Sequence, residues 1–305
     1  MRSPRFAYFE GRIVPFDQAR VSVATHAFNY GTAVFGGLRG YWNADRQRLF
    51  VFRPWEHYQR LLYSARLLCM EVSYDVESLI QITLDLLRAE AWQEDVYIRP
   101  MFYKADTGIG VRLHNLKEEL TIWSTPFQKY IQNDTSAHVT ISSWRRIDDN
   151  VIPARGKVSG AYVNSALAKT DAARAGFDEA LVLDQNGHVS EGSAMNVFMV
   201  RDGVVITPPV TENILEGITR RTVLELVRNE LGLPVVERPI DRSEVAICDE
   251  FFMTGTAAQI VAVTRVDHRP IGNGVMGPIT ARLRELFEDV VRGRNERYCA
   301  WLLEV

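Results

Sequence analysis

The chain has little lysine, little cysteine and no long apolar run. Only five of its 35 basic residues are lysines, and a net charge of −3 gives no reason to expect binding to nucleic acid or an anionic membrane. Its three cysteines, Cys69, Cys248 and Cys299, lack metal or disulfide spacing, which favours a reducing compartment. No apolar run approaches the roughly 18 residues of a membrane span, and the N-terminus has no signal-peptide core. We therefore expect a cytoplasmic globular protein.

Several common catalytic motifs are also missing. Gly156-Lys157-Val158 fails as a phosphate-binding Walker loop, and no G-x-G-x-x-G follows an expected strand. Lys157-Val158-Ser159-Gly160 does not match a nucleophile elbow. The six histidines include no pair at metal-ligand spacing, so we expect no metal. A glycosidase carboxylate pair cannot be selected from 38 acidic residues, so that class stays open but unsupported.

The length of 305 residues suggests two domains. We expect a small domain over 1–127, a linker over 128–136 and a larger domain over 137–305. Strands and helices mix without regular βαβ alternation, which indicates an α+β fold. The pattern predicts a hairpin around Gly11, and a second at 201–204. Helices are expected at 54–70, 77–91, 162–175, 218–231 and 277–292, and further strands at 95–104, 119–127, 138–144, 179–184, 197–200 and 250–254.

Lys157 stands apart from the other four lysines. It lies among small residues in the loop Ile152–Gly160, before an expected helix. Partial desolvation there would lower the pKa of its amine and favour Schiff-base formation with a carbonyl. Glu191, in the acidic turn 189–193, offers a partner for a protonated ring nitrogen. A lysine, an acidic partner and a phosphate site are what pyridoxal 5′-phosphate (PLP) requires. The alternative is an ordinary solvated lysine.

Two segments offer backbone N–H groups to anions. The run Glu212–Thr219 leads into a helix, where such groups bind phosphate, although an ordinary capping turn would look the same. Met253–Ala258 ends a strand in small residues that suit an anion nest or a tight strand-to-helix turn. Arg60, on the polar face of its helix, is either a surface arginine or a phosphate clamp. Tyr97 and Arg99 share a strand face, as a carboxylate site or a structural ion pair would require.

Together these motifs resemble the class IV aminotransferases, which are fold-type IV PLP enzymes, and most of all the branched-chain amino acid aminotransferases. The likeness runs from His26-Ala27-Phe28-Asn29-Tyr30-Gly31-Thr32-Ala33-Val34-Phe35 to Gly277-Pro278-Ile279-Thr280, with order and spacing kept. It implies a small N-terminal α/β domain and a larger PLP-binding domain with a mixed, barrel-like sheet. The family's loop over Gly108–Leu113 usually reaches a neighbouring subunit, which implies a homodimer or a higher homo-oligomer.

The resemblance also implies a role for each matching residue. Lys157 would hold the cofactor as a Schiff base and move the substrate proton, Tyr162 would donate to the phenolic oxygen, and Glu191 would pair with the pyridine nitrogen. Arg60, Ile218, Thr219 and Thr256 would hold the phosphate. The substrate pocket would comprise Tyr30, Phe35, Arg39, Tyr97, Arg99, Tyr130, Thr256 and Ala257.

The chain departs from the family pattern in two places. Gly36-Gly37 replaces the usual Glu-Gly after the phenylalanine, and Ala194-Met195-Asn196 replaces Gly-Glu-Asn. Glu191 is intact, so these changes concern the substrate range. The reaction implied is transamination of branched-chain L-amino acids with 2-oxoglutarate. The alternatives are a D-amino acid or (R)-amine transaminase, an aminodeoxychorismate lyase-type elimination, and a non-catalytic PLP carrier.

Overall fold

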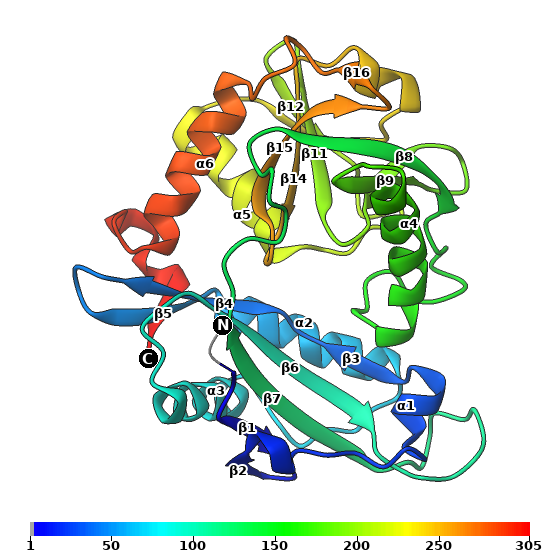
Figure 1. The fold of residues 1–305 in the computed structure, drawn as a ribbon, viewed down its shortest axis with the longest axis vertical. Coiled ribbons are helices and arrows are strands. Elements are labelled where there is room, and N and C mark those ends of the chain that lie inside the picture. Colours follow the sequence, from blue (N-terminus) through cyan, green and yellow to red (C-terminus); the bar gives the residue numbers. More distant parts are fainter. Residues whose placement is uncertain (1–2) are drawn as a thin grey trace. The chain divides into compact units, whose positions relative to one another are not determined.

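The computed structural model describes residues 3–305, which form two compact units. Unit 1 comprises 1–128, 156–161 and 289–305, and unit 2 comprises 129–155 and 162–288. Each unit is built on its own sheet (Figure 1). The short segment 156–161 brings Lys157 into unit 1, although its sequence neighbours on both sides belong to unit 2. The domain limits expected above, with a linker over 128–136, remain a prediction.

Unit 1 contains an eight-stranded sheet in the order β17-β5-β4-β6-β7-β1-β2, with β3 also paired to β6. Its long central strands, β6 and β7, run antiparallel, and Arg99 lies opposite Trp123. Along β6, the buried Val96 and Ile98 alternate with the half-buried Tyr97 and Arg99. The strands are β1 Phe6–Phe9, β2 Arg12–Pro15, β3 Ala33–Phe35, β4 Leu38–Asn43, β5 Arg48–Phe52, β6 Val96–Lys104, β7 Glu118–Pro126 and β17 Leu302–Glu304.

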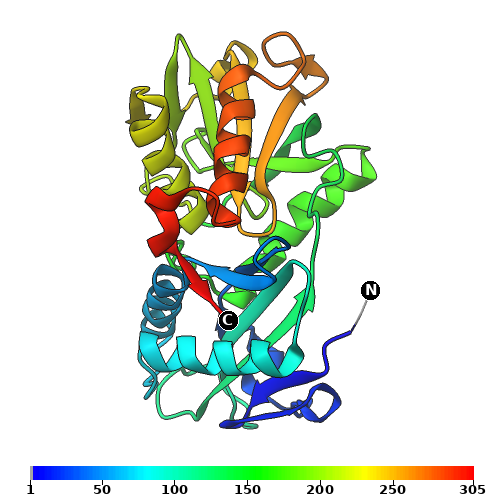
Figure 2. The same ribbon diagram turned by 90° about the vertical axis from the view of Figure 1, so that its left-hand side faces the viewer.

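Helix α2 of unit 1 begins at the predicted residue, α3 begins one residue before the predicted 77, and the short helix α1 was not predicted. Helix α2, Pro54–Leu67, has Pro54 in its first turn, and α3, Val76–Glu90, is capped by the side chain of Asp75. These two helices pack against each other, and α3 also contacts β1 and β7 (Figure 2). The remaining elements of the unit are the short helix α1 His26–Tyr30 and the 3₁₀ turns η1 Phe16–Gln18, η2 Ser159–Ala161 and η5 Glu296–Trp301.

Unit 2 contains a nine-stranded mixed sheet in the order β10-β9-β8-β15-β14-β11-β12-β13, with β16 paired to β15. The buried core on this sheet includes Val197, Met199, Phe251 and Val261. The strands are β8 Ala137–Arg145, β9 Glu179–Leu183, β10 Val189–Gly192, β11 Asn196–Arg201, β12 Val204–Thr207, β13 Val235–Glu237, β14 Glu250–Gly255, β15 Gln259–Val266 and β16 Arg269–Pro270. The two mixed α/β units confirm the expected α+β class.

Helices cover the sheet of unit 2. Helix α4, Tyr162–Arg174, packs Ala168 and Ala172 on β8 and β9, and α5, Ile218–Leu226, contacts β14 (Figure 1). The helix expected over 218–231 continues after α5 as the π-helical turn η3, Val227–Leu231, and stops at the left-handed Gly232. The other elements are the 3₁₀ turn η4 Arg242–Ala246 and α6 Pro278–Val291.

The structure confirms both expected hairpins and differs from the sequence predictions at strand β15 and at the end of α2. Both expected hairpins are present, with Glu10-Gly11 and Asp202-Gly203 at positive φ, as two-residue turns require. Strand β15, by contrast, follows Thr256–Ala258, so that turn joins two strands and not a strand to a helix. The helix expected over 54–70 ends at Leu67, so Cys69 lies exposed beyond the end of α2. Among residues 3–305, no helix combines the length and the apolarity that a membrane crossing demands.

Candidate active site

Lys157 is held in unit 1 through its backbone. Its N–H donates to Ser64 Oγ at 3.1 Å, and its carbonyl accepts from Phe35 N at 3.0 Å. The adjoining turn is fixed by Gly160 N donating to Gly31 O at 3.1 Å. A Cβ at Gly31, which has a positive φ, would lie 2.8 Å from Gly160 Cα, so this close approach requires glycine at position 31. The side chain of Lys157 is therefore presented by a loop with a defined conformation.

The surroundings of Lys157 differ from those of the other lysines. Each of the other four forms an ion pair with a carboxylate. The N–O distances are 2.6 Å for Lys104 with Glu118, 2.6 Å for Lys117 with Glu119, 3.0 Å for Lys129 with Asp134 and 3.0 Å for Lys169 with Glu179. The amine of Lys157 lies 5.1 Å from the centroid of the Phe35 ring. An aromatic face attracts the cationic form of an amine, and the predicted reaction of Lys157 with a carbonyl compound remains a prediction.

Positive charge gathers around the same loop. His57, on α2, is 2% exposed, and burial lowers its pKa well below 6.5, with further lowering by the charges of Arg60, Lys157 and Arg53. Its Nδ1 is buried without a hydrogen-bond partner among residues 3–305. The imidazole is therefore neutral, and the cations near it create a potential that favours an anion such as a phosphate. Arg60, half-buried on α2, is the predicted phosphate ligand in this group.

Tyr97, Arg99 and Phe35 form one group in unit 1. Arg99 donates to the Tyr97 hydroxyl at 3.0 Å, and its guanidinium carbon lies 4.4 Å from the centroid of the Phe35 ring. The shared strand face predicted for Tyr97 and Arg99 is therefore confirmed. Arg99 Nε is buried and has no hydrogen-bond partner within residues 3–305. A buried donor of this kind, beside an apolar ring, suits a ligand that carries a carboxylate.

The expected acidic turn at 189–193 is mostly strand β10, and it carries Glu191. A register shift between Val189 and Glu191 against β9 marks a β-bulge, which reorients the side chains on the strand. The Glu191 carboxylate, 5% exposed, is paired with Arg146 at 3.0 Å. It also accepts from Asn196 Nδ2 at 3.2 Å and from Leu215 N at 3.1 Å. These donors stabilise the ionised carboxylate, and an ionised carboxylate fits the protonated ring nitrogen of PLP.

Two of these partners were missed by sequence reasoning. Arg146 pairs with Glu191 and also donates to Asn213 O at 3.0 Å, so it ties Glu191 to the turn before α5. Nothing in the sequence separates Arg146 from the chain's other arginines. Asn196 was noted only beside the unusual Met195, but it also donates to Leu215 O at 2.8 Å. The departure from the family pattern at 194–195 leaves Asn196 in place. Met195 itself is a buried core residue.

The start of α5 follows the prediction for an anion site. Gly217 caps the helix, no side chain caps it, and Ile218 and Thr219 are buried. The first N–H groups of such a helix bind an anion favourably. On the neighbouring β14, Thr254 Oγ1 is buried without a partner among residues 3–305, two residues before Thr256 and Ala257. The phosphate and carboxylate contacts of Ile218, Thr219, Thr256 and Ala257 remain predictions.

The contacts of the remaining predicted site residues do not indicate what they bind. Arg39 is 2% exposed and donates to Phe127 O at 2.8 Å and to Gln128 O at 3.2 Å, which fixes the end of β7. The Tyr30 hydroxyl accepts from Gly110 N at 3.3 Å. Tyr162 is the first residue of α4. Tyr130 is 39% exposed, with Lys169 Nζ 5.7 Å from its ring centroid. Their roles in binding stay predictions.

The unusual Gly36-Gly37 pair lies against strand β6, which carries Tyr97 and Arg99. A Cβ at Gly36 would lie 2.7 Å from Pro100 Cγ. A Cβ at Gly37 would collide with the Tyr97 hydroxyl, so a residue without a side chain is required where Tyr97 and Arg99 meet.

Similarity to known proteins is extensive. The family model described as amino-transferase class IV matches residues 35–266. A "probable branched-chain-amino-acid aminotransferase" of Aquifex aeolicus is 48% identical over 98% of this chain and 96% of its own length. The branched-chain aminotransferase of Thermoproteus uzoniensis with norvaline has a TM-score of 0.94 at 38% identity, covering 99% of both chains. The branched-chain amino acid aminotransferase of T.th., complexed with N-(5′-phosphopyridoxyl)-L-glutamate, has a TM-score of 0.93 at 38% identity and the same coverage.

Proposed function

Because the chain belongs to the class IV aminotransferases, we propose that it is a PLP-dependent enzyme that transfers the amino group of branched-chain L-amino acids to 2-oxoglutarate. The products are branched 2-oxo acids and L-glutamate. The observation that carries the proposal is the group of Lys157, Phe35 and Arg99, in which both cationic side chains contact one aromatic ring. A relative crystallised with norvaline and another with a phosphopyridoxyl-glutamate support this choice of apolar and acidic substrates.

Each residue has a distinct task in this reaction. Bound PLP supplies the electron sink for the loss of the substrate's α-proton. Lys157 attaches the cofactor and accepts and returns that proton at its ε-amine. Glu191, held ionised by Arg146, Asn196 and Leu215 N, keeps the ring nitrogen protonated. Arg60 and the start of α5 bind the phosphate, and Tyr162 donates to the phenolic oxygen. These residue roles are part of the proposal.

The substrate pocket has to accept two unlike side chains in turn. Phe35 and Tyr97 offer an apolar wall for leucine, isoleucine or valine. Arg99 Nε, buried without a hydrogen-bond partner within residues 3–305, offers a charged donor for the γ-carboxylate of glutamate. A panel of amino donors of both chiralities, each assayed with 2-oxoglutarate, tests the function. Preference for D-amino acids or (R)-amines, or pyruvate release from aminodeoxychorismate without 2-oxoglutarate, would replace it with one of the alternatives.

Arg99→Ala is expected to impair the glutamate half-reaction selectively. Loss of a charged hydrogen-bond partner at a partly buried site costs about 2–5 kcal/mol of binding. At 1.4 kcal/mol per decade, this corresponds to roughly thirtyfold to several-thousandfold weaker reaction with glutamate. Single-turnover loss of the cofactor's absorption band measures each half-reaction, and leucine should change much less. Arg48→Ala, an arginine whose side chain is 59% exposed, is the control. Equal losses for leucine and glutamate would show that Arg99 is structural or binds the α-carboxylate.

We extend the proposal to a homodimer located in the cytoplasm. Several large apolar side chains on α1 and the loop before β7 are exposed, including Phe28 at 69% and Ile109 at 101%. A second copy of the chain would bury such residues, as the family resemblance implies. The purified protein should therefore have twice the mass of one chain in light scattering. Asp substitutions at Ile109 and Val111 should shift that mass toward the monomer, and a monomeric wild type would contradict the dimer.

A further inference from the structure

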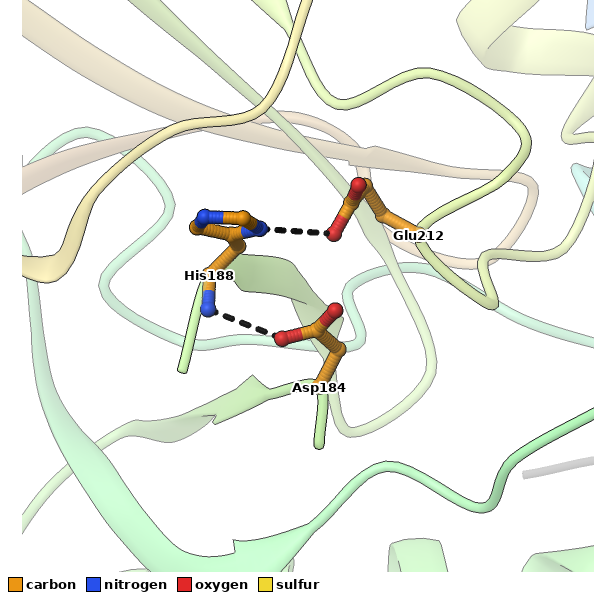
Figure 3. A group of neighbouring side chains, drawn as sticks. All are labelled: Asp184, His188 and Glu212. Carbon is orange, nitrogen blue, oxygen red and sulfur yellow. Dashed lines mark hydrogen bonds and ion pairs between the residues drawn. The ribbon is translucent and has the colours of Figure 1, made fainter. Parts of the chain in front are cut away.

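Three potential metal ligands meet in unit 2, and none of the three side chains has a role in the function proposed above. Asp184 follows β9, His188 precedes β10, and Glu212 lies in the turn before α5. The carboxylate oxygens of Asp184 and Glu212 and an imidazole nitrogen of His188 all lie within 4.8 Å of one another. Figure 3 shows the three side chains facing a common point, with His188 Nδ1 3.3 Å from Glu212 Oε2. The sequence did not predict this group, because Glu212 lies 24 residues after His188 along the chain.

The charge of this group is not balanced by a lysine or an arginine. Asp184 is 2% exposed and Glu212 is 8% exposed. Within residues 3–305, neither carboxylate is paired with a lysine or an arginine; Arg145 reaches only the backbone oxygen of Asp184. Two buried carboxylates this close require either a shared proton or a cation.

Hydrogen bonds to neighbouring residues fix the orientation of Asp184 and of the turn that carries Glu212. Asp184 Oδ1 accepts from His188 N at 2.8 Å, and Oδ2 accepts from Asn186 Nδ2 at 3.2 Å. Ser190 Oγ donates to Glu212 O at 2.6 Å, which fixes the turn that carries the third side chain. Hydrogen bonds of this kind hold metal ligands in a defined orientation. The His188 side chain is 31% exposed, so an ion from solvent can reach the group.

We propose that Asp184, His188 and Glu212 form a binding site for a divalent transition-metal ion such as Zn²⁺. One imidazole and two carboxylates are a ligand set that suits zinc, cobalt, manganese and iron. Ligands at about 2.0–2.2 Å from an ion lie at most about 4.4 Å apart, so small side-chain rotations close the observed group around it. Three protein ligands leave coordination positions for water. This site lies beyond the aminotransferase function and does not depend on it.

The site adjoins the turn that holds Glu191. Ser190, which bonds the backbone of Glu212, is the residue before Glu191. Leu215, three residues after Glu212, donates its N–H to Glu191. A bound cation would therefore anchor the same turn that supplies a hydrogen bond to Glu191.

Cobalt titration of the chelator-treated holoenzyme, followed by visible absorption, tests the site. Co²⁺ held by one imidazole and two carboxylates should give d–d bands that saturate at a single equivalent, and Zn²⁺ should displace it. His188→Phe and Asp184→Asn should each weaken Co²⁺ binding by at least about tenfold, since even outer-shell changes cost 10–100-fold. In Asp184→Asn, the side-chain amide oxygen can still accept from His188 N, so this variant preserves the turn. Glu212→Gln provides a third, independent removal of a ligand.

Two matched controls distinguish the site from adventitious binding. Asp241→Asn removes an exposed carboxylate 3.7 Å from His188 that is outside the proposed set, and His268→Gln removes an imidazole elsewhere in unit 2. Both should bind Co²⁺ as the wild type does. The proposal is overturned if the wild type gives no saturable band, or if the three ligand variants keep the band. The two carboxylates would then share a proton.

Discussion

Replacing Lys157 with alanine is expected to reduce turnover by at least about four orders of magnitude. Positioned proton transfer alone contributes about 10²–10⁴-fold, and this residue also provides the covalent attachment. Alanine keeps both backbone hydrogen bonds of the loop, to Ser64 Oγ and from Phe35 N, so the fold should persist. Steady-state transamination with leucine and 2-oxoglutarate measures the loss. Borohydride reduction followed by mass spectrometry should place the pyridoxyl group of the wild-type enzyme on Lys157.

The other lysines serve as controls for this assignment. Lys117→Ala changes a lysine whose side chain is 66% exposed, and it should leave turnover near the wild-type value. Lys104 and Lys169 are paired with Glu118 and Glu179, which leaves their amines poorly placed for attack. Detection of the pyridoxyl group on Lys104 or Lys169 would overturn the proposed role of Lys157.

Glu191→Gln is expected to lower turnover by roughly 10²–10³-fold, the usual effect of removing one preorganised electrostatic contact. A neutral amide cannot keep the ring nitrogen protonated, so the loss should exceed any loss of cofactor affinity. The variant also leaves Arg146 without the carboxylate it pairs with at 3.0 Å, and breaking a buried pair costs about 3–5 kcal/mol of stability. Turnover and PLP affinity should therefore be measured with thermal unfolding on the same sample.

A double variant and a matched control separate chemistry from stability. Glu191→Gln with Arg146→Met removes both charges and should recover part of the stability while turnover stays low. Glu179→Gln changes another fully buried, ion-paired glutamate of unit 2, and it should lower stability without a comparable loss in turnover per folded enzyme. If Glu191→Gln retained wild-type turnover, Glu191 would have no role at the ring nitrogen.

The elements with strong local signals were predictable. Pro54 and Asp75 mark the starts of α2 and α3, and Asp202-Gly203 adopts the positive φ angles of a two-residue turn. Their signals lie within a few residues, so no distant contact is needed to read them. Strand β15 was missed because its run of small and β-branched residues follows a turn that also suits a helix start. Its pairing with β14 and β8 decides its conformation, and pairing with distant strands leaves no local signature.

The site residues also fall into those with a local sequence signal and those without one. Lys157 was singled out by its loop of small residues, and Glu191 by its place in the acidic turn that resembles the family motif; both assignments remain predictions. Arg146 was not found, because an arginine at the end of a strand looks like any other until the fold brings it to Glu191. The bulge in β10 was equally invisible, since a register shift depends on the partner strand β9.

By itself, the sequence determined the α+β composition, most helix starts and hairpin turns, and the chemical types of the groups proposed to react, because each depends on local geometry or on side-chain identity. The tertiary structure decided which charges meet. It placed Arg99 against Phe35, gave Glu191 its buried donors, and brought Glu212 to Asp184 and His188. The physical reason is that electrostatic interactions depend on distance and burial, and for residues far apart in the chain both are set only when the chain folds.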